Sequence, residues 1–206
     1  MKIYDVANFP NPLRVRVALA EKNALDSVTF IPVDLMNGEH RSAAFLAKNP
    51  GAGVPVLELD DGTYISECTA ITEYIDHTFD GPSLTGSTPK ERAVINMMQS
   101  RAESMVLDAI ATYFHHGTDG LGPELETYQN KEWGQKQREK AIRGLEYFNS
   151  ILENQDFIAG DSFTAADITL WSGLVFGGFC GVGIPSELTN LIKWHEQVLA
   201  RPSIAA

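Results

Sequence analysis

The feature that most constrains the fold is a change of pattern at residues 79–89. This segment consists of turn formers and small polar residues, which is typical of a linker between domains. Before it, short strand-like and helix-like stretches alternate, and after it the patterns are long and helical. At 206 residues the chain is long enough for one large domain or two small ones. We therefore expect a first domain over residues 1–79, a linker over 80–87 and a second domain over 88–206.

The first domain is predicted to be α/β, in the order strand, helix, strand, helix, strand, strand, helix. Strands are expected at residues 2–6, 28–34, 54–59 and 63–65, and helices at residues 12–23, 41–48 and 67–79. A strand–helix–strand unit requires parallel strands joined by a right-handed crossover. The turn Asp60-Asp61-Gly62 then predicts an antiparallel hairpin at one edge of the sheet.

The second domain is predicted to be entirely helical. Helices are expected from Pro89 toward His116, at residues 133–155 and 188–199, and through the apolar run 168–171. Proline suits the first helical position because the nitrogen at that position needs no partner within the helix. Thr164 and Asp167 have the spacing of a capping box, in which each side chain bonds the backbone N–H of the other residue.

Composition excludes several classes of function. Acidic residues outnumber basic ones by 27 to 16, and a chain with a net charge of −11 repels nucleic-acid phosphates. No apolar run approaches the length of about eighteen residues that a transmembrane helix needs. Residues 1–6 include an acid where a signal peptide has a continuous apolar stretch. Only Cys68 and Cys180 are present, far apart, so we expect neither a disulfide framework nor a metal site, and a soluble cytoplasmic protein.

The segment at residues 9–12 joins the first strand to the first helix. Because Pro12 disfavours helical geometry at the residue before it, Asn11 is predicted to be the N-cap residue. Its role can be capping alone. Alternatively, the free amides and positive dipole end of this helix face an anion such as a thiolate, to which the Asn11 amide donates a hydrogen bond. Arg14 and Arg16 are interpreted as salt-bridged structural residues, although Arg14 lies close enough to influence the loop.

Two further segments offer groups that can bind a ligand. A cis bond between Val54 and Pro55 would expose backbone groups of a sheet edge to an extended, peptide-like ligand, whereas a trans proline would only protect that edge. At the helix start near Glu67 and Cys68, backbone amides can receive a carboxylate and the Glu67 carboxylate can hold an ammonium group. Alternatively, Glu67 is simply favourable at a helix start and Cys68 is a small core residue.

These three segments, together with F-T-A-A-D-I-T-L at residues 163–170, resemble the glutathione transferase superfamily. The resemblance covers nearly the whole chain. It implies a thioredoxin-like N-terminal domain that binds glutathione and an all-helical C-terminal domain that contributes the site for a second substrate. It also implies a cytoplasmic homodimer that acts in detoxification, with glutathione as co-substrate and no metal.

The resemblance assigns roles to individual residues. It implies that Pro55 is a cis proline, that the Val54 backbone pairs with the cysteinyl unit of glutathione, and that Glu67 and Cys68 hold the γ-glutamyl end. His40 lies in a theta-like pattern in which this histidine meets the glycyl carboxylate. Further residues implied are Phe9 and Asn11 beside the sulfur, and Glu103, which would reach the glutathione amine of a partner subunit.

Most of these enzymes use Tyr, Ser or Cys to activate the glutathione thiol, and this chain has none of these residues at the corresponding position. Asn11 there is similar to the bacterial Nu class, in which asparagine supports glutathione and disulfides are also reduced. We expect a transferase that adds the glutathione thiolate to hydrophobic electrophiles; a glutathione-dependent disulfide oxidoreductase and a non-catalytic glutathione-binding protein are the alternatives. The second-substrate site is expected between the domains, unless the following aromatic residues are simply core: Tyr113, Phe114, His115 and Trp171.

Overall fold

The computed structural model describes residues 1–204 of the chain. Two compact units are present: one extends from Met1 to Thr85, and the other begins at Gly86. The linker expected at residues 80–87 contains this boundary. Each unit is described separately below.

The first unit is built on a four-stranded sheet in the order β2-β1-β3-β4. The strands are β1 (Lys2–Asp5), β2 (Thr29–Pro32), β3 (Val56–Glu58) and β4 (Tyr64–Ile65). β1 and β2 are parallel, whereas β3 is antiparallel to both β1 and β4. The predicted crossover unit and the predicted edge hairpin are therefore both confirmed.

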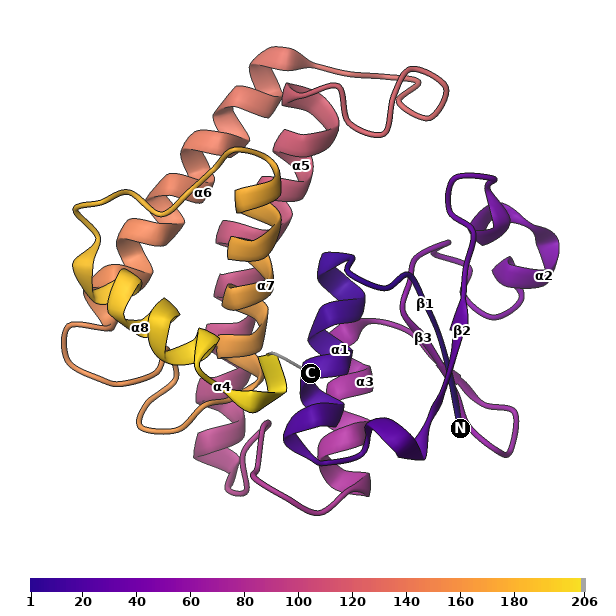
Figure 1. Cartoon of the computed structure of the whole chain (residues 1–206), viewed down its shortest axis with the longest axis horizontal. Coiled ribbons are helices and arrows are strands. Elements are labelled where there is room, and N and C mark those ends of the chain that lie inside the picture. The colour runs from indigo at the N-terminus through magenta and orange to yellow at the C-terminus, as the bar shows by residue number, and fades with distance from the viewer. Residues whose placement is uncertain (205–206) are drawn as a thin grey trace. The chain divides into compact units, whose positions relative to one another are not determined.

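Helices cover both faces of this sheet. α1 (Pro10–Glu21) and α3 (Cys68–Thr78) lie side by side on one face, and the short α2 (Ala43–Leu46) lies on the other (Figure 1). Phe45 of α2 packs with Val56, and its ring meets that of Tyr4 edge-on at 6.5 Å. Because side chains alternate along a strand, their neighbours in β1 and β3 point toward α1 and α3 instead.

A buried ion pair fixes the end of the first unit. Lys22 Nζ, just after α1, lies 2.7 Å from Asp76 Oδ1 in the last turns of α3. Asp76 also accepts hydrogen bonds from the backbone N–H groups of Leu84 and Thr85 and from the Thr85 hydroxyl. These donors hold the pKa of Asp76 below its ordinary value although burial opposes the shift. Both helix ends are thereby tied to the segment where the unit ends.

The second unit is helical, as predicted. Its elements are α4 (Pro89–Ala102), the π-helix η3 (Glu103–Leu107), α5 (Asp108–Gly117), α6 (Lys131–Ile151), α7 (Ala165–Phe179), α8 (Thr189–Leu199) and the 3₁₀ turn η4 (Pro202–Ile204). The single long helix predicted from Pro89 is thus interrupted by η3. A side chain on Gly144 of α6 would come within 2.8 Å of the Met105 carbonyl oxygen in η3, so this glycine permits close packing on the π-helix.

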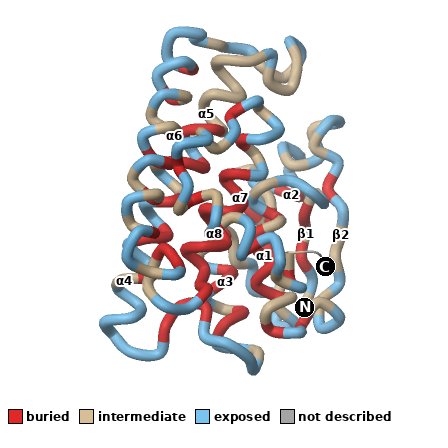
Figure 2. Tube along the Cα trace, turned by 60° about the vertical axis from the view of Figure 1, so that its left-hand side comes forward, coloured by how far each residue is buried: buried red, intermediate tan, exposed pale blue. Residues whose placement is uncertain are grey.

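The capping box predicted from Thr164 and Asp167 is present at the start of α7, a helix that is buried over most of its length (Figure 2). Asp167 Oδ2 accepts from the Thr164 N–H and hydroxyl, and Oδ1 accepts from Ile158 N–H and Trp194 Nε1, all at 3.0 Å. Burial raises the pKa of this carboxyl to about 6, against the opposite effect of the four donors. None of the helices within residues 1–204 combines the length and apolarity needed to cross a membrane.

Candidate functional site

The sheet topology brings four chain segments to one end of the first unit. β1 and β2 are parallel and therefore finish at the same end, while the antiparallel β3 starts there and β4 finishes there. The residues that follow or precede these strand ends are 6–11, 33–42, 54–55 and 66–68. These ranges contain all the glutathione-binding residues predicted in the first domain.

α1 begins earlier than the sequence pattern indicated. Its first helical residue is Pro10 and its N-cap is the extended Phe9, so the predictions that Asn11 is the N-cap and that the helix starts at Pro12 are wrong. Either proline satisfies the requirements of a first helical turn, because no N–H there has a partner within the helix. The preference for extended geometry before proline is met at Phe9, whereas Asn11 is helical although it precedes Pro12.

This start leaves few backbone donors. Pro10 and Pro12 have no N–H, and the Leu13 N–H donates to the Phe9 carbonyl oxygen at 3.0 Å. The several free amides expected here are therefore reduced to one, the N–H of Asn11. Together with its side-chain amide, Asn11 supplies all the uncommitted N–H donors of the first turn of α1.

Asn11 is held at two of its other atoms. Its side-chain Oδ1 accepts a hydrogen bond from Arg14 Nη1 at 3.2 Å, and its backbone carbonyl accepts one from the Cys68 thiol at 3.3 Å. Arg14 is buried with 2% of its surface exposed, whereas Asn11 itself is exposed. The Cys68 contact joins the start of α1 to the start of α3, so two of the predicted site segments are in direct contact.

The bond between Val54 and Pro55 is cis, as the resemblance implied. Val54 lies just before β3, and its side chain packs against the cluster of Val33, Phe45 and Val56. Asn49 shapes the preceding turn, since its side chain accepts from Gly51 N–H and donates to the Gly53 carbonyl, both at 2.9 Å. Within residues 1–204, no protein hydrogen bond engages the backbone N–H or C=O of Val54, so both remain available to a ligand.

The start of α3 has an unusual backbone. Glu67, the N-cap residue, has a φ of 68°, which is a left-handed conformation rare for residues other than glycine. Its carbonyl accepts the Ile71 N–H at 3.0 Å, while its side chain is exposed. Cys68 is the first helical residue and is buried. N–H groups at the start of a helix can receive an anion, and the exposed Glu67 carboxylate can receive a cation.

His40 lies in the 3₁₀ turn η2 (Glu39–Arg41), between β2 and α2. Its Nδ1 is buried and, among the described residues, has no hydrogen-bond partner. Burial, and secondarily the neighbouring Arg41, lower the pKa of His40. The ring is therefore neutral near pH 7 and presents an unsatisfied polar atom, which is costly unless a ligand completes it.

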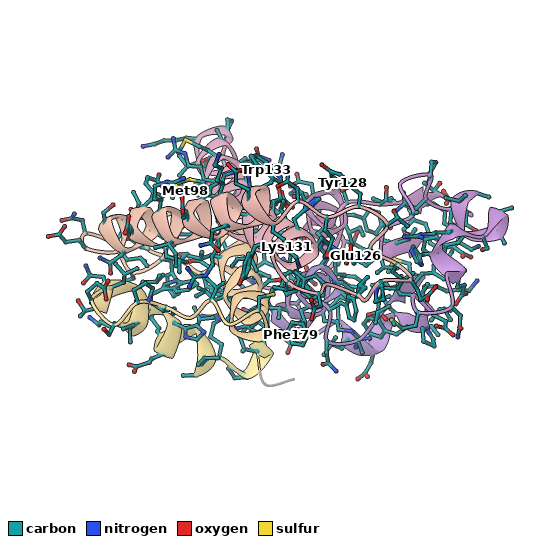
Figure 3. The ribbon with its side chains drawn as sticks, turned by 90° about the horizontal axis from the view of Figure 1, so that it is seen from above. Met98, Glu126, Tyr128, Lys131, Trp133 and Phe179 are labelled. Carbon is teal, nitrogen blue, oxygen red and sulfur yellow. The ribbon has the colours of Figure 1, made fainter. Side chains whose placement is uncertain are left out.

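In the second unit, the predicted aromatic residues of α5 are joined by two further rings. The centroid of the Phe114 ring lies 5.4 Å from that of Phe176 and 6.0 Å from that of Phe179. Phe179 is the last residue of α7 and is 77% exposed (Figure 3). Trp171 makes no ring contact with this cluster among the described residues; it is buried, and its Nε1 has no hydrogen-bond partner. Tyr113 is partly buried and packs beside Gly117, where an added Cβ would collide with its ring.

The His115 ring is engaged by the loop between α5 and α6. Its Nδ1 lies 2.7 Å from Glu126 Oε1, and the same oxygen accepts the Leu121 N–H at 2.9 Å. Gln129 Nε2 donates to the backbone carbonyl of His115 at 2.6 Å. Figure 3 labels Glu126 on this loop. His115 thus organises the loop through one ring nitrogen, an arrangement that periodicity alone does not reveal. Glu103, the remaining predicted residue, is the first residue of η3 and is partly buried.

Comparison with known proteins identifies the fold and the family. Residues 10–78 match the family described as "Glutathione S-transferase, N-terminal domain", and residues 121–206 match "Glutathione S-transferase, C-terminal domain". The chain is 54% identical over 204 residues to glutathione S-transferase 2 of Saccharomyces cerevisiae, which covers 99% of this chain and 88% of the yeast protein.

Two solved structures agree with this result. A glutathione S-transferase domain-containing protein from Marinobacter aquaeolei matches with a TM-score of 0.97 at 61% identity, covering 99% of this chain and 100% of that one. Gtt2 from Saccharomyces cerevisiae matches with a TM-score of 0.96 at 54% identity, covering 100% of this chain and 99% of that one. The protein, with its thioredoxin-like first unit and helical second unit, therefore belongs to the glutathione S-transferase family.

Proposed function

We propose that this protein transfers the glutathione thiolate to hydrophobic electrophiles, with the sulfur held at the start of α1. The observation that carries the proposal is the donor arrangement at Asn11. Two prolines remove the neighbouring backbone donors, and the exposed Asn11 offers one backbone and two side-chain N–H groups at the positive end of the helix dipole.

Asn11 acts in this proposal by stabilising charge. An amide cannot accept the thiol proton at neutral pH, so the proton passes to solvent and the anion that remains is held by N–H donors. A hydrogen bond to a charged group contributes about 1.5–3 kcal/mol, and about 1.36 kcal/mol lowers a pKa by one unit. One or two such bonds therefore suffice to make a useful fraction of bound thiolate near pH 7. The thiolate attacks an electrophilic carbon, a C–S bond forms, and the leaving group departs with the displaced electron pair.

The other three segments are proposed to hold the rest of the tripeptide. The backbone N–H and C=O of Val54 pair with the cysteinyl unit, as in an added β-strand. The γ-glutamyl carboxylate meets the N–H groups at Cys68, and its ammonium meets Glu67. His40 Nδ1 donates to the glycyl carboxylate, which would satisfy this buried atom. Phe9 borders the sulfur, and Glu103 is assigned to the glutathione amine of a partner subunit in a homodimer.

The electrophile is assigned to the second unit. Phe114 presents a partly exposed ring with two aromatic neighbours, and Tyr113 and His115 lie beside it in α5. Trp171 adds a buried indole whose N–H has no partner among residues 1–204. Partly exposed aromatic rings favour a planar, apolar acceptor.

A second candidate function is glutathione-dependent disulfide reduction, as the Nu-like Asn11 suggests. One glutathione thiolate would attack a disulfide sulfur and release the other sulfur as a thiolate, and a second glutathione would resolve the mixed disulfide. The observation that favours it is that no protein thiol is presented at α1: the Cys68 thiol is buried and donates to the Asn11 carbonyl. All the sulfur chemistry would then belong to glutathione. A glutathione-binding protein without turnover is the remaining alternative.

The test combines thiolate spectroscopy with turnover. The ultraviolet absorbance of bound glutathione is titrated with wild type and Asn11→Ala, and both are assayed with chlorodinitrobenzene and with hydroxyethyl disulfide. We expect a depressed thiol pKa in wild type, and a loss of about tenfold or more in conjugation for N11A. Dominant disulfide turnover would select the second candidate, and binding without either turnover would select the third. Unchanged turnover in N11A would remove Asn11 from the mechanism.

A further inference from the structure

We propose that Arg14 is a positioning residue, which fixes the orientation of the Asn11 amide so that its N–H groups, and not its oxygen, face the glutathione sulfur. The inference rests on the proposed function and adds to it a residue that acts through another. Arg14 Nη1 donates to Asn11 Oδ1 at 3.2 Å from the same face of α1, three residues further along.

The chemistry of the two groups makes the bond selective. An asparagine amide has an accepting oxygen at one end and a donating NH₂ at the other. A guanidinium has donors only, so Arg14 can bind the oxygen end but not the nitrogen end. The alternative orientation would present oxygen lone pairs to a thiolate and place two donors against each other. Arg14 therefore determines which end of Asn11 a sulfur anion would meet.

The surroundings allow Arg14 to do this with little freedom. The terminal torsion of an asparagine side chain is broad, so an exposed Asn11 would otherwise sample both orientations. Arg14 is only 2% exposed and is thus confined by its neighbours. The Asn11 backbone is fixed separately by the Cys68 thiol at 3.3 Å. Backbone and side chain of Asn11 are therefore held by different residues.

Arg16 provides the matched comparison. It lies two residues further along the same helix, but its Nε donates to Asp5 Oδ2 at 2.8 Å and its guanidinium stacks 3.8 Å from the Phe30 ring. No hydrogen bond joins it to Asn11 in the described part of the chain. A substitution of Arg16 thus changes a guanidinium of α1 without changing the orientation of the amide.

The main experiment is a double-mutant cycle with Arg14→Met and Asn11→Ala, with Arg14→Lys as the conservative variant and Arg16→Lys as the control. Three quantities are measured: the thiol pKa of bound glutathione, kcat with chlorodinitrobenzene, and the affinity for S-methylglutathione, which has no thiol. We expect R14M to raise the thiol pKa and to lower kcat about tenfold while S-methylglutathione affinity stays within twofold. R14K should retain most of the activity, and R16K all of it.

The cycle separates positioning from a direct effect of charge. If Arg14 acts through Asn11, R14M has no further effect on the thiol pKa in the N11A background. An equal effect of R14M in both backgrounds would overturn the inference, and so would an unchanged thiol pKa in R14M. A wild type that binds glutathione without a depressed thiol pKa would instead contradict the proposed function.

A second variant keeps the test valid if removal of the buried Arg14 prevents folding. Asn11→Asp retains oxygens for Arg14 and the backbone N–H, but it loses both side-chain N–H donors. We expect N11D to lose conjugation at least as strongly as N11A, with S-methylglutathione affinity within about threefold of wild type. Wild-type conjugation by N11D would show that no side-chain donor at this position is needed and would overturn the inference.

Discussion

The starts of α1 and α7 solve the same problem in opposite ways. Both are N-termini whose first N–H groups lack partners within the helix. At α7, Thr164 and Asp167 form a capping box, and one buried carboxylate accepts four donors from three residues. At α1, no side chain caps the helix, two prolines remove donors, and the remaining ones belong to an exposed Asn11. The comparison separates a helix start used for stability from one that is open to a ligand.

The same contrast extends to buried polar atoms. Asp167 is saturated by its neighbours, whereas His40 Nδ1 has no partner among the described residues although it is buried. Buried polar groups are almost always paired, so an unpaired His40 Nδ1 at this end of the sheet indicates a position where a ligand can bind. The difference between the two starts can be tested by substitutions that affect one and spare the other.

The largest effect is expected from Asp167→Ala. Removing the acceptor leaves several buried donors unpaired, each costing about 1–3 kcal/mol, so the free energy of unfolding should fall by at least about 3 kcal/mol. Urea denaturation followed by circular dichroism measures the loss. The affinity of the folded fraction for S-methylglutathione should be unchanged, because Asp167 caps α7 and is not one of the residues proposed to bind glutathione. A loss of affinity without a loss of stability would show that the start of α7 serves ligand binding and not stability.

The second prediction concerns pH. The folded pKa of Asp167 is raised to about 6, above the ordinary value of 3.8, so the folded state binds more protons than the unfolded state between these values. This group therefore adds stability as pH falls from 6 toward 4, with a slope of about 1.4 kcal/mol per pH unit. Asp167→Asn cannot titrate and should lack this contribution. Parallel unfolding free energies of wild type and D167N across pH 4–7 would contradict it.

The third prediction concerns His40 in η2, at the end of the sheet where the candidate site lies. Burial lowers the pKa of this imidazole, so it is neutral before binding, and a glycyl carboxylate beside it would raise the pKa again. Binding of S-methylglutathione should therefore take up protons and weaken as pH rises through the titration range of His40. Calorimetry in buffers of different ionisation enthalpy measures the uptake. His40→Gln should abolish it and weaken binding about two- to tenfold; equal proton uptake in both proteins would exclude His40 from the site.

The smallest effect is expected from Pro12→Ala, which makes the start of α1 more like an ordinary helix start. The substitution restores one N–H in the first turn, and a group near a helix N-terminus gains about 0.3–1 kcal/mol from such donors. The thiol pKa of bound glutathione should fall by about 0.2–0.7 as a result. An unchanged thiol pKa would show that Asn11 alone donates hydrogen bonds to the sulfur.

Local patterns predicted much of this fold because their signals lie within a few residues. The Thr164–Asp167 spacing and the turn at residues 60–62 are of this kind. The start of α1 was misplaced by two residues because Pro10 and Pro12 both satisfy first-turn geometry. The π-helix η3 has no local signature: its close packing depends on Gly144, some forty residues away in sequence.

The residues of the candidate site were predicted from the resemblance, whereas their contacts could not be predicted from sequence. The resemblance placed Asn11, Val54, His40 and Glu67 at the site, and the topology brings their segments to one end of the sheet. The role proposed for Arg14 depends on a guanidinium folded back along its own helix, and sequence spacing does not specify that rotamer. The link between His115 and Glu126 likewise crosses an irregular loop, where spacing carries no information.

The way Asn11 is held has a consequence for how such a protein can change over evolutionary time. The Cys68 thiol donates to the Asn11 carbonyl, and the neighbouring Leu13 N–H donates to the Phe9 carbonyl. Neither bond depends on which side chain stands at position 11. The side chain at position 11 can therefore be replaced while the surrounding backbone keeps its conformation. A hydroxyl, thiol or amide can be installed there by a single codon replacement, so new sulfur chemistry is accessible without redesign of the scaffold.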